Sequence, residues 1–154
     1  MKVSDITVSN VTVNVIGSRQ LLVVQDKDVL MPVGMTATDM SGFTELIVGS
    51  LTPAISFHQK VRLNNDVLAL LTIETIVHEC THLFQERRMG TISYDATYGY
   101  QCGLELVKVG VAHIHQDHIM EREARFVGHT ISLNFDYSKG YLDIEYEIKK
   151  LMGW

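Results

Sequence analysis

Proline and cysteine are both scarce in this sequence, with two of each among 154 residues. Cys80 and Cys102 can form one bridge at most, which excludes a disulfide framework, and we expect both thiols to be reduced. Basic residues are also few, because 13 Lys and Arg face 18 Asp and Glu and leave a net charge of −5. A nucleic-acid binder would need a basic face, so nucleic acid is not an expected partner.

Long apolar runs are missing as well. No run reaches the roughly 18 to 20 residues that a membrane span needs, and the N-terminus has no basic segment followed by an apolar stretch and a cleavage site. We therefore expect no membrane association and a cytoplasmic location. Hydrophobic residues make up 46% of the chain and charged residues 20%, which is ordinary for one globular domain of this length.

The N-terminal part of the chain is typical of β-structure, because short runs of β-branched residues alternate with turn residues. Gly17-Ser18 and Asp26-Lys27-Asp28 are expected to separate the first strands, and residues 34–42 are expected to form a loop. The predicted strands are Ile6–Val8, Val11–Val15, Leu21–Val24, Phe43–Val48 and Ala54–His58.

A helical period begins near Asn65, where apolar residues recur at spacings of three and four up to Phe84. With Asn64 or Asn65 as its cap and Gly90 as its stop, this helix is predicted over Asp66–Arg88. Residues 121–133 and 141–152 are predicted as two further helices.

These elements predict a single α+β domain over residues 1–154. A small N-terminal sheet, mainly within residues 1–62, is expected to pack on the 66–88 helix, and residues 116–152 are expected to be helical. On the second helix, Met120, Ala124, Ile131 and either Phe126 or Val127 should face inward.

The residues most indicative of chemistry are His78-Glu79-Cys80-Thr81-His82 on the first predicted helix. Histidines four residues apart stand one turn apart on one face, so both can reach a single metal ion. Glu79 lies beside that face, where a general base can take a proton from metal-bound water. We interpret Cys80 as helix filler that points away from the two histidines.

A catalytic zinc ion usually takes three protein ligands, and the third must come from elsewhere in the chain. The residues after His82 lack the glycine and third histidine of the pattern H-E-x-x-H-x-x-G-x-x-H. Glu121, on a helix expected to pack against the motif helix, is the favoured third ligand, with Glu123 as its rival. A further set of alternatives is His113, His115 and His118.

The motif resembles that of the gluzincin type of zinc metallopeptidase, because Glu121-x-x-Ala124 looks like the E-x-x-A-D segment of several gluzincin families. With Gln85, the same residues are similar to minimal zincin domains of phages and toxin-delivery systems. The resemblance covers about residues 66–133. It implies a Zn²⁺ site with His78, His82 and Glu121 as ligands and Glu79 as the base.

The sequence departs from that family pattern at Arg125, where many relatives place an aspartate that orients a ligand histidine. Glu74, one turn before His78, could take over part of this contact, although a surface charge is the simpler interpretation. His58 and His129 are interpreted as structural. Candidate donors to the oxyanion of acyl hydrolysis are Tyr94, Tyr98, Tyr100, His115 and His118.

The favoured function is a zinc metallopeptidase that hydrolyses a peptide or protein substrate through a zinc-bound water activated by Glu79. One alternative is a zincin-like phage virion or assembly protein, with a structural or weakly active metal site inside a larger viral or secretion particle. Another is a zinc-dependent hydrolase of a non-peptide amide. The retained Glu79 favours catalysis, because a structural site has no use for a base beside an open coordination position.

Overall fold

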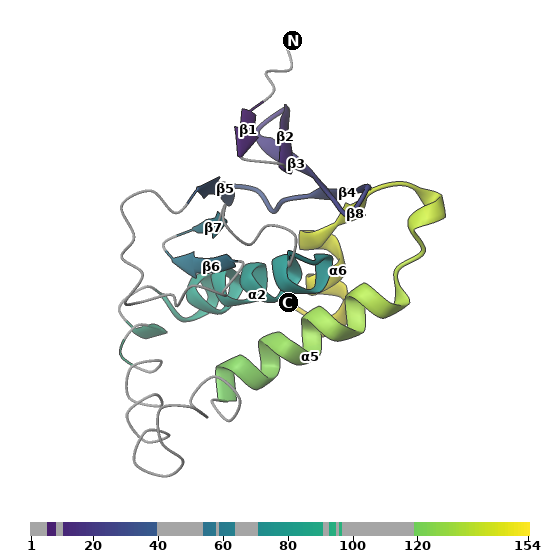
Figure 1. Cartoon of the computed structure of the whole chain (residues 1–154). Helices are drawn as coiled ribbons and strands as arrows, with labels where there is room; N and C mark the ends of the chain where they lie inside the picture. The colour runs from purple at the N-terminus through teal and green to yellow at the C-terminus, as the bar shows by residue number, and fades with distance from the viewer. Residues whose placement is uncertain are drawn as a thin grey trace.

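The computed structural model describes residues 6–8, 11–39, 54–57, 59–63, 71–90, 93–94, 96 and 119–154. Over these residues the chain forms two small β-sheets, three α-helices and one short 3-10 helix (Figure 1). The prediction of a small α+β fold is confirmed. No described helix combines the length and the apolar character that crossing a membrane requires.

The first sheet has the strand order β1-β2-β3-β4-β8. The strands β1 (Ile6–Val8), β2 (Val11–Ile16), β3 (Arg19–Val24) and β4 (Lys27–Leu30) are consecutive and antiparallel. The predicted break at residues 26–28 is confirmed at Asp26 and was wrong at residues 27–28, because β4 already begins at Lys27. The chain turns at Gln25 and Asp26, whose φ angles of 52° and 61° suit a two-residue hairpin turn.

The second sheet has the strand order β5-β7-β6. Its strands are β5 (Thr36–Asp39), β6 (Ala54–Phe57) and β7 (Lys60–Leu63). The loop predicted for residues 34–42 was wrong at Thr36–Asp39, which pairs in parallel with Lys60–Leu63, a distant partner that the local sequence does not reveal. Residues 40–42 lie outside the described residues. Residues 43–48, predicted as a strand, lie outside the described residues.

The motif helix, α2 (Ile73–Met89), starts later than predicted. Thr72 has extended backbone angles and its side chain accepts a hydrogen bond from the Thr75 amide, so Thr72 is the N-cap and a continuous helix from Asp66 was wrong. The predicted C-terminal stop is confirmed, since Gly90 is the C-cap. The predicted apolar stripe from Ile73 to Phe84 is buried.

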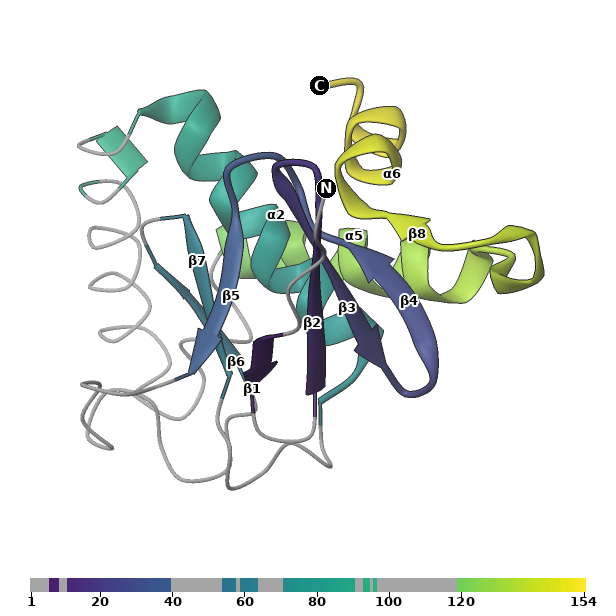
Figure 2. The ribbon, with the colours of Figure 1, turned by 90° about the horizontal axis from the view of Figure 1, so that it is seen from above.

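The helices α5 (Ile119–Asn134) and α6 (Ile144–Met152) correspond to the two predicted C-terminal helices. On α5, Val127 is buried and Phe126 is exposed, which settles the alternative between them. α6 starts later than the predicted Tyr141, because Leu142–Asp143 forms β8 in parallel with β4 (Figure 2). Asp143 then caps α6.

A bidentate ion pair strengthens this junction between the first sheet and α6. The two Arg19 Nη atoms lie 2.6 and 3.2 Å from the Asp143 carboxylate oxygens, and Arg19 Nε donates to the Met31 carbonyl oxygen at 2.9 Å. One carboxylate therefore caps a helix and holds an arginine from β3 at the same time.

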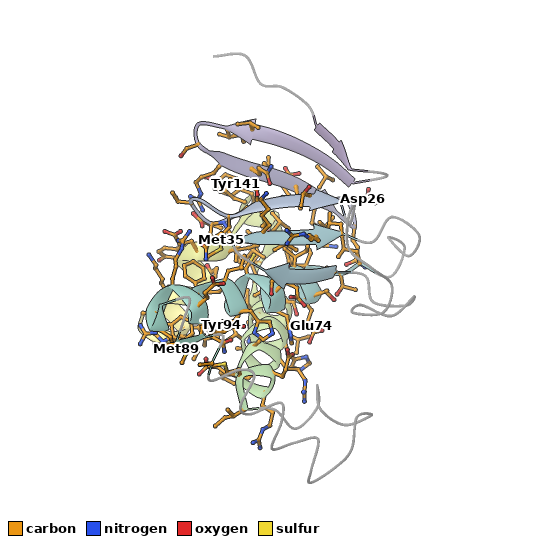
Figure 3. The ribbon with its side chains drawn as sticks, turned by 90° about the vertical axis from the view of Figure 1, so that its left-hand side faces the viewer. Asp26, Met35, Glu74, Met89, Tyr94 and Tyr141 are labelled. Carbon is orange, nitrogen blue, oxygen red and sulfur yellow. The ribbon has the colours of Figure 1, made fainter. Side chains whose placement is uncertain are left out.

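The motif helix lies between the strands and α5 (Figures 1 and 3). Its apolar side faces the hydrophobic core, and its other side contacts α5 along most of its length. Removing these apolar side chains from water supplies the main favourable free-energy term in folding. Fully buried core side chains come from both sheets and from α2, α5 and α6, among them Leu22, Val29, Met31, Val61, Leu63, Ile76, Val77, Cys80, Val127, Leu142, Ile144 and Ile148.

Candidate metal centre

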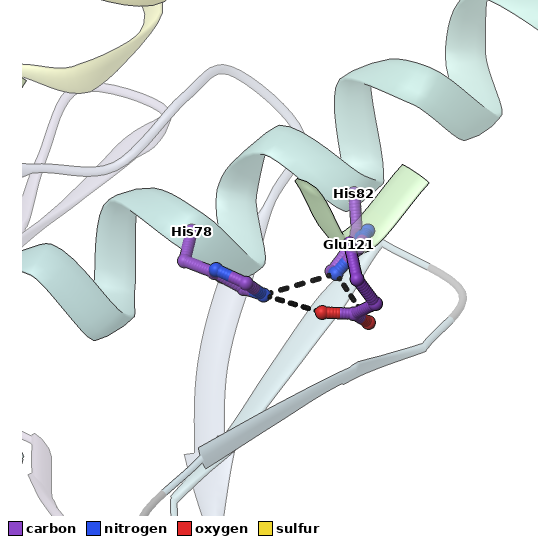
Figure 4. Close-up of side chains that lie close together, drawn as sticks. All are labelled: His78, His82 and Glu121. Carbon is purple, nitrogen blue, oxygen red and sulfur yellow. Dashed lines mark hydrogen bonds and ion pairs between the residues drawn. The ribbon is translucent and has the colours of Figure 1, made fainter. Parts of the chain in front are cut away.

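The two motif histidines point from α2 to one place (Figure 4). Their spacing of four residues puts both rings on the side of the helix that faces α5, and their Nε2 atoms lie 3.2 Å apart. The His82 side chain is 6% exposed and that of His78 is 19% exposed. Both ligand atoms are therefore fixed in a nearly solvent-free contact between two helices.

Glu121, in the first turn of α5, reaches the same place from the opposite helix. One carboxylate oxygen lies 2.9 Å from His78 Nε2 and the other lies 2.9 Å from His82 Nε2. Among the described residues, these three side chains are the group whose ligand atoms are close enough to hold one metal ion. The cluster of His78, His82 and Glu121 can thus bind a metal ion.

The close contact between α2 and α5 depends on a residue that the sequence analysis did not single out. A Cβ atom on Gly128 would lie 2.8 Å from the Glu74 carbonyl oxygen and 3.3 Å from the backbone nitrogen of His78. Gly128 follows Glu121 by two helical turns and lies on the same face of α5. Its missing side chain lets the helices approach closely enough for Glu121 to contact both histidines, and a glycine inside a predicted helix was the available signal.

The electrostatics of the cluster call for a positive charge between its members. A carboxylate can only accept hydrogen bonds, and a neutral imidazole offers a lone pair on the nitrogen that carries no hydrogen. Burial lowers the pKa of His82, but the hydrogen bond and charge of Glu121 and the charge of Glu79 outweigh this and raise the pKa to about 9. Without a metal ion, a proton on His82 supplies the charge.

This proton gives the metal-free protein a specific pH dependence. The folded-state pKa of about 9 exceeds the ordinary value of 6.5, so the stabilisation is complete below about pH 6.5 and is lost as the pH rises through about 9. We expect the free energy of unfolding in chelator to fall more between pH 7 and 9.5 in the wild type than in His82→Gln, measured by urea denaturation. Parallel pH profiles would contradict this pairing.

Glu79 lies next to the cluster, and the residue as a whole is half-buried. Burial raises the pKa of Glu79, while the charges of His82 and His78 and a hydrogen bond from Ser56 oppose this change without cancelling it. Ser56 belongs to β6, so the sheet contributes a contact to the predicted base. A carboxylate with a raised pKa is a stronger base than an ordinary surface glutamate.

Glu123, the rival third ligand, is not part of the cluster. Its carboxylate accepts a hydrogen bond from Gln85 Nε2 at 2.8 Å, and Gln85 Oε1 in turn lies 2.9 Å from His82 Nδ1. Glu123 and Glu121 are two residues apart on a helix and so point in different directions. The structure therefore brings Glu121, and not Glu123, to the two histidines.

The remaining predicted residues divide into described and undescribed ones. Glu74 Oε1 lies 3.3 Å from His129 Nδ1 near the surface, so Glu74 joins α2 to α5 there. Cys80 is free and buried, which agrees with the predicted reduced thiol. Tyr94 is half-buried, and its backbone N–H donates to Gly90. The candidates outside the described residues are His58, Tyr98, Tyr100, Cys102, His113, His115 and His118.

Comparison with protein-family models, curated proteins and solved structures gives no match for this chain. The similarity to zinc metallopeptidases therefore stays a prediction from the motif residues. What the molecule adds to it is the geometry of two imidazoles and one carboxylate that meet between α2 and α5.

Proposed function

We propose that this protein is a zinc-dependent hydrolase of peptide bonds, with His78, His82 and Glu121 as zinc ligands and Glu79 as the general base. The observation that carries the proposal is the convergence of two imidazole Nε2 atoms, 3.2 Å apart, with the two Glu121 oxygens, each 2.9 Å from one of them, beside the half-buried Glu79. Three protein ligands and an adjacent base form the arrangement of a catalytic zinc site.

The donor set and its dimensions fit zinc. Two imidazole nitrogens and one carboxylate oxygen are ligands that zinc accepts, whereas magnesium and calcium prefer oxygen alone. Bond lengths of about 2.0 to 2.2 Å imply separations of roughly 3.3 to 3.6 Å between tetrahedral ligand atoms. The observed separations, 3.2 Å between the two nitrogens and 2.9 Å from each nitrogen to one Glu121 oxygen, are roughly 0.1 to 0.7 Å shorter, so the side chains would have to move apart by that amount to accommodate the ion.

Glu79 supplies the proton transfer in this proposal. When bound, zinc would act as a Lewis acid towards water and the substrate carbonyl group. The Glu79 carboxylate would accept a proton from the attacking water and deliver it to the departing amine. Its raised pKa suits the first step, because the group binds the proton more readily than an ordinary carboxylate does.

The position of β6 supports an extended peptide as the substrate. Among the described strands, β6 is an outer strand of its sheet and lies against α2, and its Ser56 contacts Glu79. An outer strand offers backbone hydrogen-bonding groups to which a peptide can add as a further strand. A peptide held there would pass beside the predicted base.

We expect Glu79→Gln to retain zinc and to lose peptide hydrolysis by about 100-fold to 10,000-fold, the usual contribution of a general base. The measurement is turnover of a fluorogenic peptide library with zinc and with chelator, together with zinc content by elemental mass spectrometry. Glu147→Gln, on α6 and outside the cluster, is the matched control and should keep full activity. A zinc-loaded wild type that cleaves nothing in the library, or a fully active Glu79→Gln variant, would overturn the peptidase proposal.

A further inference from the structure

Gln85 is a buried polar residue whose contacts extend in two directions. It follows His82 by three residues on α2, and 5% of its surface is exposed. Its Oε1 atom lies 2.9 Å from His82 Nδ1, and its Nε2 atom lies 2.8 Å from Glu123 Oε1 and 3.2 Å from the Met120 carbonyl oxygen. The side chain thus connects one motif histidine to the first turn of α5.

The chemistry of these partners fixes the orientation of the Gln85 amide. A backbone carbonyl and a carboxylate can only accept hydrogen bonds, so the atom that faces Met120 and Glu123 must be the NH₂ group. The amide oxygen then faces His82, and an oxygen acceptor requires a hydrogen on Nδ1. In the neutral imidazole the lone pair is consequently on Nε2, the atom 2.9 Å from Glu121.

We propose that Gln85 is a positioning residue of the metal site, which holds the His82 ring with its hydrogen on Nδ1 and its Nε2 lone pair towards the ion. Glu123 holds Gln85 in turn, and it would act on the ion only through Gln85 and His82. The inference rests on the metal-binding part of the proposed function and not on the peptidase activity. It replaces the ligand role considered for Glu123 with an orienting one.

The variant Gln85→Met has a similar volume and removes both hydrogen-bonding groups. Outer contacts of metal ligands are typically worth 10-fold to 100-fold in affinity. We expect zinc affinity to fall by that factor in a competition titration against a chromophoric chelator. Arg122→Ala, at an exposed position of α5, is the control that should bind zinc like the wild type.

A second pair of variants separates positioning from packing. Gln85→Glu places a carboxylate against Glu123 and the Met120 carbonyl oxygen, so zinc affinity should fall at least as far as in Gln85→Met. Adding Glu123→Gln to Gln85→Glu supplies an NH₂ donor from the other side, and we expect at least a tenfold recovery of affinity. A residue that only fills space would show no such recovery.

Nitrogen-15 NMR of the zinc-loaded wild type gives the direct readout. We expect a slowly exchanging proton on His82 Nδ1, which should be lost or exchange rapidly in Gln85→Met. Equal zinc affinity and the same Nδ1 signal in Gln85→Met and the wild type would overturn the role of Gln85 alone. A wild type that takes up no zinc would instead overturn the proposed function on which that role depends.

Discussion

Replacing Glu121 by glutamine is expected to lower metal affinity by at least about 100-fold, a larger loss than removal of an outer contact causes. The substitution keeps the shape of the side chain and removes the one negative charge that contacts both histidines. Two imidazoles and a neutral amide oxygen would then hold the ion, with no negatively charged ligand in a largely buried place. The measurement is metal content after dialysis, combined with a chelator competition titration.

Glu123→Gln is the matched control, because it makes the same chemical change two residues away on the same helix. Its amide oxygen can still accept the hydrogen bond from Gln85, so we expect metal affinity to change by less than about threefold. Equal losses in the two variants, or a greater loss in Glu123→Gln, would contradict the assignment of Glu121 as the third ligand.

A side chain at position 128 is expected to weaken both the fold and the metal site. Alanine in place of glycine would favour an exposed helix by about 1 kcal/mol. At Gly128, however, the added Cβ would lie 2.8 Å from a backbone oxygen of α2, which cannot move aside as a flexible side chain could. Overpacking typically costs about 1 to 3 kcal/mol, so we expect Gly128→Ala to be destabilising and Gly128→Val more so.

Zinc affinity measures how this packing effect reaches the metal site. Separating α5 from α2 moves Glu121 away from His78 and His82, so zinc affinity should fall about tenfold in Gly128→Ala, while the melting temperature drops by a few degrees. Arg122→Ala, at an exposed position of α5, should leave both quantities unchanged. A Gly128→Ala variant that is more stable than the wild type and binds zinc as well would show that the helices are not in tight contact there.

Local sequence predicted those elements whose signals lie within one short segment. The β1 and β2 strands, the end of α2 at Gly90 and the extent of α5 follow from alternation, helical period and capping. Four strands, β4, β5, β7 and β8, were not among the predicted ones. Of these, β5 and β8 pair in parallel with a distant partner. The residues within a short segment do not show which distant strand will pair with it. The β5 segment was therefore predicted as a loop and the β8 segment as part of a helix.

The start of α2 shows the same limit on a smaller scale. The apolar period from Val67 to Leu71 continues into the helix and predicted an earlier start. Thr72, with extended backbone angles and a side chain bonded to the Thr75 amide, begins the helix instead. A helical period does not by itself fix where a helix begins, and here the cap marks the first turn of α2.

For the candidate site, the sequence alone determined that His78 and His82 share one face of a helix and that Glu79 stands beside them, because the helical repeat fixes these directions. The tertiary structure decided which acidic residue joins them. The packing of α5 on α2, which Gly128 permits, selects Glu121 and leaves Glu123 to hold Gln85. That choice depends on how α2 and α5 pack against each other. The two helices are separated in the sequence by residues 90–118, so the spacing of residues within either helix does not specify their packing.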